Sequence, residues 1–72
     1  MDAQTLAKTI KRRTKSGEWW AWKKIGSVSD ARYTLLSWGW LERKTLRQDD
    51  PMRRNAGAQF AYRWTESVVG RV

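Results

Sequence analysis

The chain has 72 residues, of which fifteen are lysine or arginine and seven are aspartate or glutamate, so that its formal net charge is +8. It contains no cysteine and no histidine, which excludes disulfides and the usual zinc-finger ligand sets. A single domain of this size has too little interior for a deep catalytic cavity, and the large positive charge favours a polyanionic partner such as nucleic acid.

Six tryptophans are the main candidates for the core, because each can bury on the order of 200 Å². No run of about 18 apolar residues and no signal-peptide core occur, so we expect a soluble cytoplasmic protein without membrane contact. The carboxylates are scattered, and Asp49 and Asp50 are the only adjacent pair. General acid–base catalysis needs groups that converge in a shielded site, so we predict no enzyme, cofactor, metal or small-molecule ligand.

A first helix is predicted over residues 2–15. Asp2 is a favourable N-cap residue, and one helical face is apolar, with Ala3, Leu6, Ala7 and Ile10. The opposite side carries four basic residues, Lys8, Lys11, Arg12 and Lys15. This ridge is either a solvated face or an additional surface for phosphates, and the sequence leaves both open.

A second helix is predicted over residues 18–25, because Trp19, Trp22 and Ile25 recur at helical spacing. A strand stays open as the alternative, since the run is short and tryptophan also favours strands. Aromatic rings near lysines can stack on single-stranded bases, but we expect these tryptophans to fill the core, since the chain has little else to bury.

The third helix, predicted over residues 28–38, is the element around which the chain is organised. Ser27 and Asp30 form an S-x-x-D capping box, and Gly39 stands where a left-handed C-terminal cap is needed. Its polar positions point away from the apolar face and are Ser29, Asp30, Tyr33, Thr34 and Ser37. Arg32 falls among the apolar positions and is expected to reach outward from the helix edge.

Two strands are predicted at residues 40–47 and 58–65. In the second, Phe60, Tyr62 and Trp64 alternate with other residues, which is typical of a half-buried strand. The stretch between them, residues 48–57, collects turn-forming residues without apolar periodicity and is predicted to be a loop. Helices followed by a hairpin make the predicted fold a single α+β domain over residues 1–72.

The order of these parts resembles the winged helix-turn-helix family of small bacterial and phage transcription regulators. The resemblance is carried by Leu35-x-x-x-Gly39-x-Leu41, by the basic loop over residues 48–57, and by Tyr62-Arg63-Trp64-Thr65, which is similar to the family's Tyr-x-Leu-Thr. It covers residues 25–66. It implies three short helices followed by a two-stranded wing, and sequence-specific binding of double-stranded DNA. By analogy, we expect a nucleoid-associated transcription regulator of phage or prophage type in a bacterial or phage-infected cell.

The resemblance also implies which residues contact DNA. The helix over residues 28–38 would enter the major groove and turn Ser29, Asp30, Tyr33 and Ser37 toward base edges or the adjoining backbone. Arg32 would be the candidate for a guanine contact. Phosphates and the flanking minor groove would be contacted by basic and amide side chains, Lys23, Lys24, Arg47, Arg53, Arg54 and Asn55. A homodimer on DNA is compatible with this reading, because one such domain covers few base pairs.

The alternative is a winged-helix adaptor that binds a host protein or RNA through its aromatic and basic surface. Exposed tryptophans would then anchor the partner, as aromatic residues often do at interfaces. The salt dependence of binding distinguishes the two functions, because affinity for DNA phosphates falls steeply as the salt concentration rises.

Overall fold

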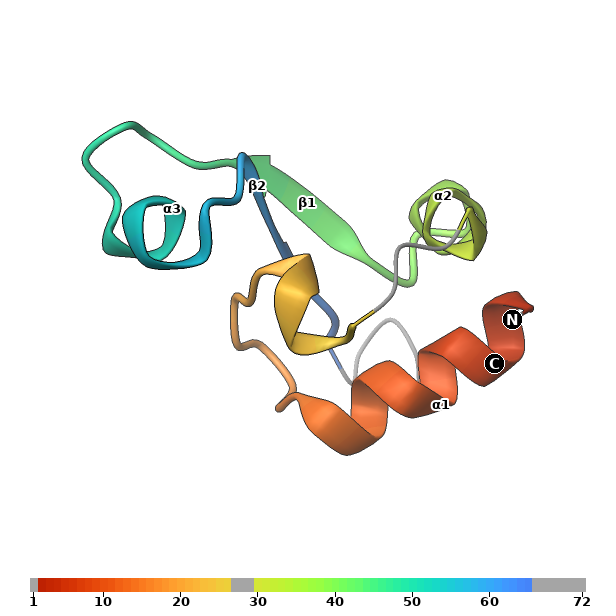
Figure 1. Ribbon diagram of the computed structural model, residues 1–72. Helices are drawn as coiled ribbons and strands as arrows, with labels where there is room; N and C mark the ends of the chain where they lie inside the picture. Colours follow the sequence, from red (N-terminus) through yellow and green to blue (C-terminus); the bar gives the residue numbers. More distant parts are fainter. Residues whose placement is uncertain (1, 27–29, 66–72) are drawn as a thin grey trace.

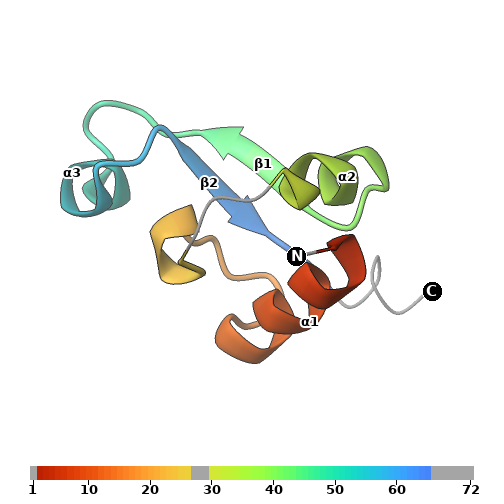
Figure 2. The ribbon, with the colours of Figure 1, turned by 45° about the vertical axis from the view of Figure 1, so that its right-hand side comes forward.

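The computed structural model describes residues 2–26 and 30–65, which form a small α+β domain with three α-helices, a 3₁₀ helix and a two-stranded antiparallel hairpin (Figure 1). In chain order, the elements are α1 (Ala3–Arg13), η1 (Trp22–Lys24), α2 (Ala31–Ser37), β1 (Glu42–Thr45), α3 (Pro51–Ala56) and β2 (Phe60–Arg63). The hairpin separates α2 from α3, which lie at its opposite ends, and η1 lies between the hairpin and α1 (Figures 1 and 2). No helix of the described residues is long and apolar enough to cross a membrane.

The first predicted helix is confirmed as α1, and its apolar face is buried at Leu6, Ala7 and Ile10. Asp2 caps it: Asp2 Oδ1 accepts a hydrogen bond from the Thr5 N–H at 2.7 Å, and this bond holds the pKa of Asp2 below its ordinary value. The hydroxyl of the buried Thr14 accepts a hydrogen bond from Trp64 Nε1 at 2.7 Å. The end of α1 is thereby joined to the residue that follows β2.

The prediction of a helix over residues 18–25 is wrong for most of that range. Trp20 is extended and pairs with Tyr62, and the backbone N–H of each donates to the carbonyl of the other at 2.9 and 2.8 Å. Only Trp22–Lys24 is helical, as η1. Pairing beside β2 gives the backbone of Trp20 its hydrogen bonds and buries its ring. These interactions stabilise the extended conformation more than the weak helical preference of such a short segment stabilises a helix.

Three aromatic rings form the centre of the core. The ring centroid of Trp20 lies 5.5 Å from that of Trp22 and 5.6 Å from that of Tyr62, and Trp22 and Tyr62 meet edge to face at 5.1 Å. The expectation that tryptophans fill the core is confirmed for Trp20, Trp22 and Trp64, and it is wrong for Trp19, which is half-buried and is not part of the core cluster. The other three tryptophans retain solvent exposure, namely Trp19, Trp38 and Trp40.

The third predicted helix is observed as α2, which is shorter than residues 28–38. Residues 27–29, and with them Ser29 and the Ser27 half of the predicted capping box, lie outside the described residues. Asp30 occupies the N-cap position, but its side chain makes no capping hydrogen bond there.

The C-terminus of α2 is confirmed as predicted. Gly39 has a φ of +79°, in the left-handed region. Its N–H donates to the Leu36 carbonyl at 3.1 Å, and the Trp40 N–H donates to the Leu35 carbonyl at 3.0 Å. These two bonds form a Schellman motif, which satisfies helix carbonyls and turns the chain toward β1.

Both strands are shorter than the predicted ranges 40–47 and 58–65, and their register runs from Glu42 opposite Arg63 to Thr45 opposite Phe60. The prediction of a loop over residues 48–57 is wrong for Pro51–Ala56, which forms α3.

Local capping explains why α3 forms without a buried face. Asp50 Oδ1 accepts a hydrogen bond from the Met52 N–H at 2.8 Å, and Pro51 occupies the first turn, where its missing N–H costs nothing. Gly57 ends the helix with a φ of +63°. Asp50 and Pro51 therefore mark the start of α3, and Gly57 marks its end.

Candidate nucleic-acid interface

A shallow concave surface, made of two adjoining depressions, lies between α2, η1 and α3. Its α2 end is lined by Trp22, Lys23, Gly26, Arg32, Ala56, Gly57, Ala58, Gln59, Phe60 and Tyr62. Its α3 end is lined by Ala21, Lys23, Lys24, Met52, Asn55 and Ala56. Because Lys23 and Ala56 belong to both ends, we treat the two as one surface and call it the η1 groove. It brings together four of the predicted contact residues, Lys23, Lys24, Arg32 and Asn55.

The η1 groove is positively charged. It carries three cationic side chains, and none of its lining residues is acidic. Lys24 forms an ion pair with Glu18 at 3.3 Å, and this hydrogen bond and charge hold the pKa of Glu18 below its ordinary value. No acidic side chain of residues 2–26 and 30–65 lies within 4.0 Å of the charged atoms of Lys23 or Arg32. Lys23 and Arg32 therefore dominate the charge of the groove.

The remaining described carboxylates are not among the lining residues of the groove. Two of them cap helices, Asp2 and Asp50. Two more pair with arginines, Glu42 with Arg63 at 3.0 Å and Asp49 with Arg47 at 3.6 Å. Asp30 is exposed at the start of α2. No carboxylate lines the groove, but Glu18 offsets part of the charge of Lys24, and the pKa of Arg32 is raised by its hydrogen bond to Tyr33 with a smaller contribution from the charge of Asp30.

Beside the groove, α2 turns a polar face to solvent. Asp30, Tyr33 and Ser37 are exposed, and the Tyr33 side chain is 52% accessible. Leu35 on the opposite face is buried in the core. The predicted division into an outward polar face and an inward apolar face is therefore confirmed for Asp30, Tyr33, Ser37 and Leu35. It is wrong for Trp38, which was expected on the apolar face but is 49% exposed, and Thr34, expected on the polar face, is half-buried.

Arg32 lies at the edge of α2, close to two aromatic rings. Its guanidinium carbon is 4.8 Å from the ring centroid of Tyr33 and 5.7 Å from that of Trp22. Nη2 donates to the Tyr33 hydroxyl at 2.9 Å, and this hydrogen bond raises the pKa of Arg32. Nε is buried without a hydrogen-bond partner among the described residues. Arg32 is half-buried.

The predicted wing residues do not form one cluster. Arg53 Nη1 donates to the Leu46 carbonyl at 3.0 Å, so that Arg53 ties α3 to the end of β1. Arg47 is exposed and paired with Asp49. Arg54 and Asn55 are both exposed, and of the predicted wing residues Asn55 is the one that lines the η1 groove. Arg53 therefore acts first as a structural residue.

A second cationic cluster, which sequence reasoning missed, lies on the outer face of the hairpin. The ring centroid of Trp19 lies 4.5 Å from Lys44 Nζ and 4.5 Å from the guanidinium carbon of Arg63. Arg63 also donates twice to Glu42 Oε2, at 3.1 and 3.0 Å. We call this cluster the Trp19 face. Because Trp20 pairs with Tyr62 in an antiparallel bridge, the preceding residue Trp19 lies opposite Arg63. The sequence could not predict this neighbour, because it did not show that Trp20 is extended.

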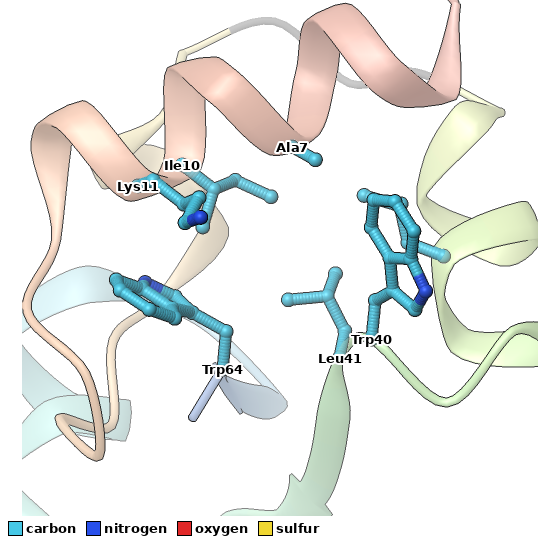
Figure 3. Close-up of a pocket in the computed structure, with 7 residues that line it drawn as sticks. Ala7, Ile10, Lys11, Trp40, Leu41 and Trp64 are labelled. Carbon is cyan, nitrogen blue, oxygen red and sulfur yellow. The ribbon is translucent and has the colours of Figure 1, made fainter. Parts of the chain in front are cut away.

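The cavity between α1 and the chain that follows α2 is too small for a cofactor. Its volume is about 10 Å³, which holds one water molecule at most. It is enclosed by Ala7, Ile10, Lys11, Leu35, Trp40, Leu41 and Trp64 (Figure 3). Within the described ranges, no three His, Cys, Asp or Glu side chains are grouped to hold a metal ion.

Comparison with known proteins finds no match to a protein-family model, to a curated protein or to a solved structure. The chemistry of the η1 groove and of α2 is therefore the basis on which a function can be assigned.

Proposed function

We propose that this chain is a winged helix-turn-helix domain that binds double-stranded DNA in a sequence-specific manner and regulates transcription. The observation that carries the proposal is the η1 groove, which holds three cations and no carboxylate and lies next to the polar face of α2. Lysine and arginine that neutralise phosphates release counterions and supply much of the affinity for DNA. Hydroxyl groups on α2 can then reach base edges or the neighbouring backbone.

The order of the elements supports this assignment. Two helical elements, α1 and η1, precede α2, and a two-stranded hairpin follows it. In the proposed complex, α2 lies in the major groove and the hairpin is the wing. Lys23 and Lys24 contact phosphates, as does the exposed Arg54 at the far end of the hairpin. Arg53 keeps its bond to the Leu46 carbonyl and holds that end of the wing in place.

Binding to a short labelled duplex is expected to weaken steeply with salt. Three phosphate contacts, from Lys23, Lys24 and Arg54, predict a slope of about −2.7 in a plot of log affinity against log salt concentration, because each contact contributes about 0.9. Fluorescence anisotropy between about 50 and 200 mM salt measures this slope. A slope near zero, or no binding at the lowest salt concentration, would refute the proposal.

A winged-helix adaptor is the second candidate, and one observation favours it. The Trp38 side chain is 49% accessible and meets Trp40 edge to face at 5.2 Å. Exposed tryptophans are enriched among the residues that dominate binding to protein partners. An interface of this kind would depend on Trp38 and show little of the salt dependence expected for DNA.

A further inference from the structure

We propose that the Tyr33 hydroxyl is the group on α2 that reads a base, and that Arg32 is a positioning residue that orients and polarises it. This inference rests on the proposed binding of double-stranded DNA. It differs from the expectation from sequence, in which Arg32 itself pairs with a guanine.

The guanidinium group of Arg32 is already engaged within the protein, which limits its direct contact with guanine. Such a contact uses two N–H groups of one fork, aimed together at O6 and N7. Nε is buried, so the fork formed by Nε and Nη2 is closed to DNA. The other fork would have to share Nη2, which already donates to the Tyr33 hydroxyl at 2.9 Å. Because Nη2 carries two N–H groups, this fork could reach guanine only by using Nη2 for DNA and for Tyr33 at the same time.

The position of Arg32 is fixed from the core side. Its guanidinium group lies against Trp22, a buried ring that is itself packed on Trp20 and Tyr62. It also lies over the Tyr33 ring, with 4.8 Å between the guanidinium carbon and the ring centroid. Arg32 thus connects the rigid core to an exposed side chain, and it limits the orientations that the Tyr33 ring can adopt before DNA binds.

This arrangement determines what the Tyr33 hydroxyl can recognise. A hydroxyl oxygen that accepts a hydrogen bond from a cation keeps its own proton, and it becomes a stronger donor because successive hydrogen bonds polarise one another. In the major groove, the acceptors are N7 and O6 of guanine, N7 of adenine and O4 of thymine, whereas cytosine presents an amino donor. We therefore expect Tyr33 to favour guanine, adenine or thymine over cytosine at one base position.

The test uses the duplex that the wild-type protein selects from a random pool. Tyr33→Phe removes only the hydroxyl, and Arg32→Lys keeps the charge but removes the guanidinium contacts. We expect each variant to bind the selected duplex about tenfold more weakly than wild type, and to lose base preference at the same single position. The double variant should bind no more weakly than the weaker single variant, because both changes remove one shared contact.

Base preference is the decisive readout, because a merely structural role for Arg32 would weaken binding to all duplexes equally. If Arg32→Lys loses affinity while Tyr33→Phe binds and discriminates like wild type, Arg32 contacts the base itself and the assignment is wrong. It is also wrong if the two losses multiply in the double variant. If wild type selects no duplex at any salt concentration, the proposed DNA binding fails as well. If wild type selects a duplex and Tyr33→Phe binds it as wild type does, the proposed DNA binding stands and only the assignment of Tyr33 as the base-reading residue is wrong.

Discussion

Replacing Trp20 with alanine is expected to lower the free energy of unfolding by about 3–5 kcal/mol. The Trp20 side chain is only 2% accessible, and it packs on Trp22 and Tyr62 at the point where the segment before η1 pairs with β2. A single core of this size rarely supplies more than about 3–5 kcal/mol of net stability. Most molecules of the variant should therefore be unfolded in the absence of denaturant, as circular dichroism and urea titration can show.

Trp38→Ala is the matched control, since it makes the same chemical change at an exposed side chain. Trp38 contacts Trp40 outside the buried core, and we expect a loss below about 1 kcal/mol. If both variants lost the same stability, Trp20 would not occupy the central place in the core that is described here.

Lys23→Glu is expected to lower the affinity for duplex DNA by about tenfold at about 0.1 M salt. Lys23 lines both ends of the η1 groove, and no described carboxylate pairs with it. The substitution removes a phosphate contact and places a negative charge in the middle of the groove. The slope of log affinity against log salt concentration should become shallower by about one unit.

Lys8→Glu changes the net charge by the same amount and serves as the control. Lys8 is exposed on α1, which does not line the η1 groove. We expect it to lower affinity by less than about threefold, through the long-range field alone. If Lys8→Glu were the more damaging change, the basic ridge of α1 would be the DNA-binding surface in place of the groove.

Local signals in the sequence were sufficient for α1 and for the end of α2. The Asp2 cap and the apolar spacing of α1 depend on neighbouring residues, so they can be predicted from the sequence without tertiary information. The same is true of Gly39, because its left-handed conformation follows from its place after the helix. Gly39 marks the end of α2, so the position of this helix in the sequence could be predicted although its length could not.

The segment before η1 could not be predicted in this way, because Trp20 is extended only through its pairing with the distant Tyr62. Tertiary pairing determined the outcome where the local preferences of tryptophan were ambiguous. The missed helix α3 is a different case. Its boundaries are marked by Asp50, Pro51 and Gly57, but they were interpreted as turn residues because the segment has no apolar stripe.

The candidate site was predictable in its charge but not in its contacts. Lys23, Lys24 and Arg32 stand out as basic residues near the predicted third helix, and the structure brings them to one groove. The bond between Arg32 and Tyr33 has no sequence signal, because adjacent residues on a helix do not normally face each other. It depends on Trp22 lying alongside Arg32, which only the packed core provides.

Whether the η1 groove and α2 face DNA is tested most directly by amide NMR spectra of the labelled protein, titrated with the selected duplex at low salt. We expect the largest shift changes in η1, in α2 and at residues 56–59, which join α3 to β2. Trp19 and Lys44, on the Trp19 face, should be unaffected. The proposed DNA-binding surface would be contradicted if the shift changes were concentrated on the Trp19 face or around Trp38 and Trp40 and the amides of the groove did not shift.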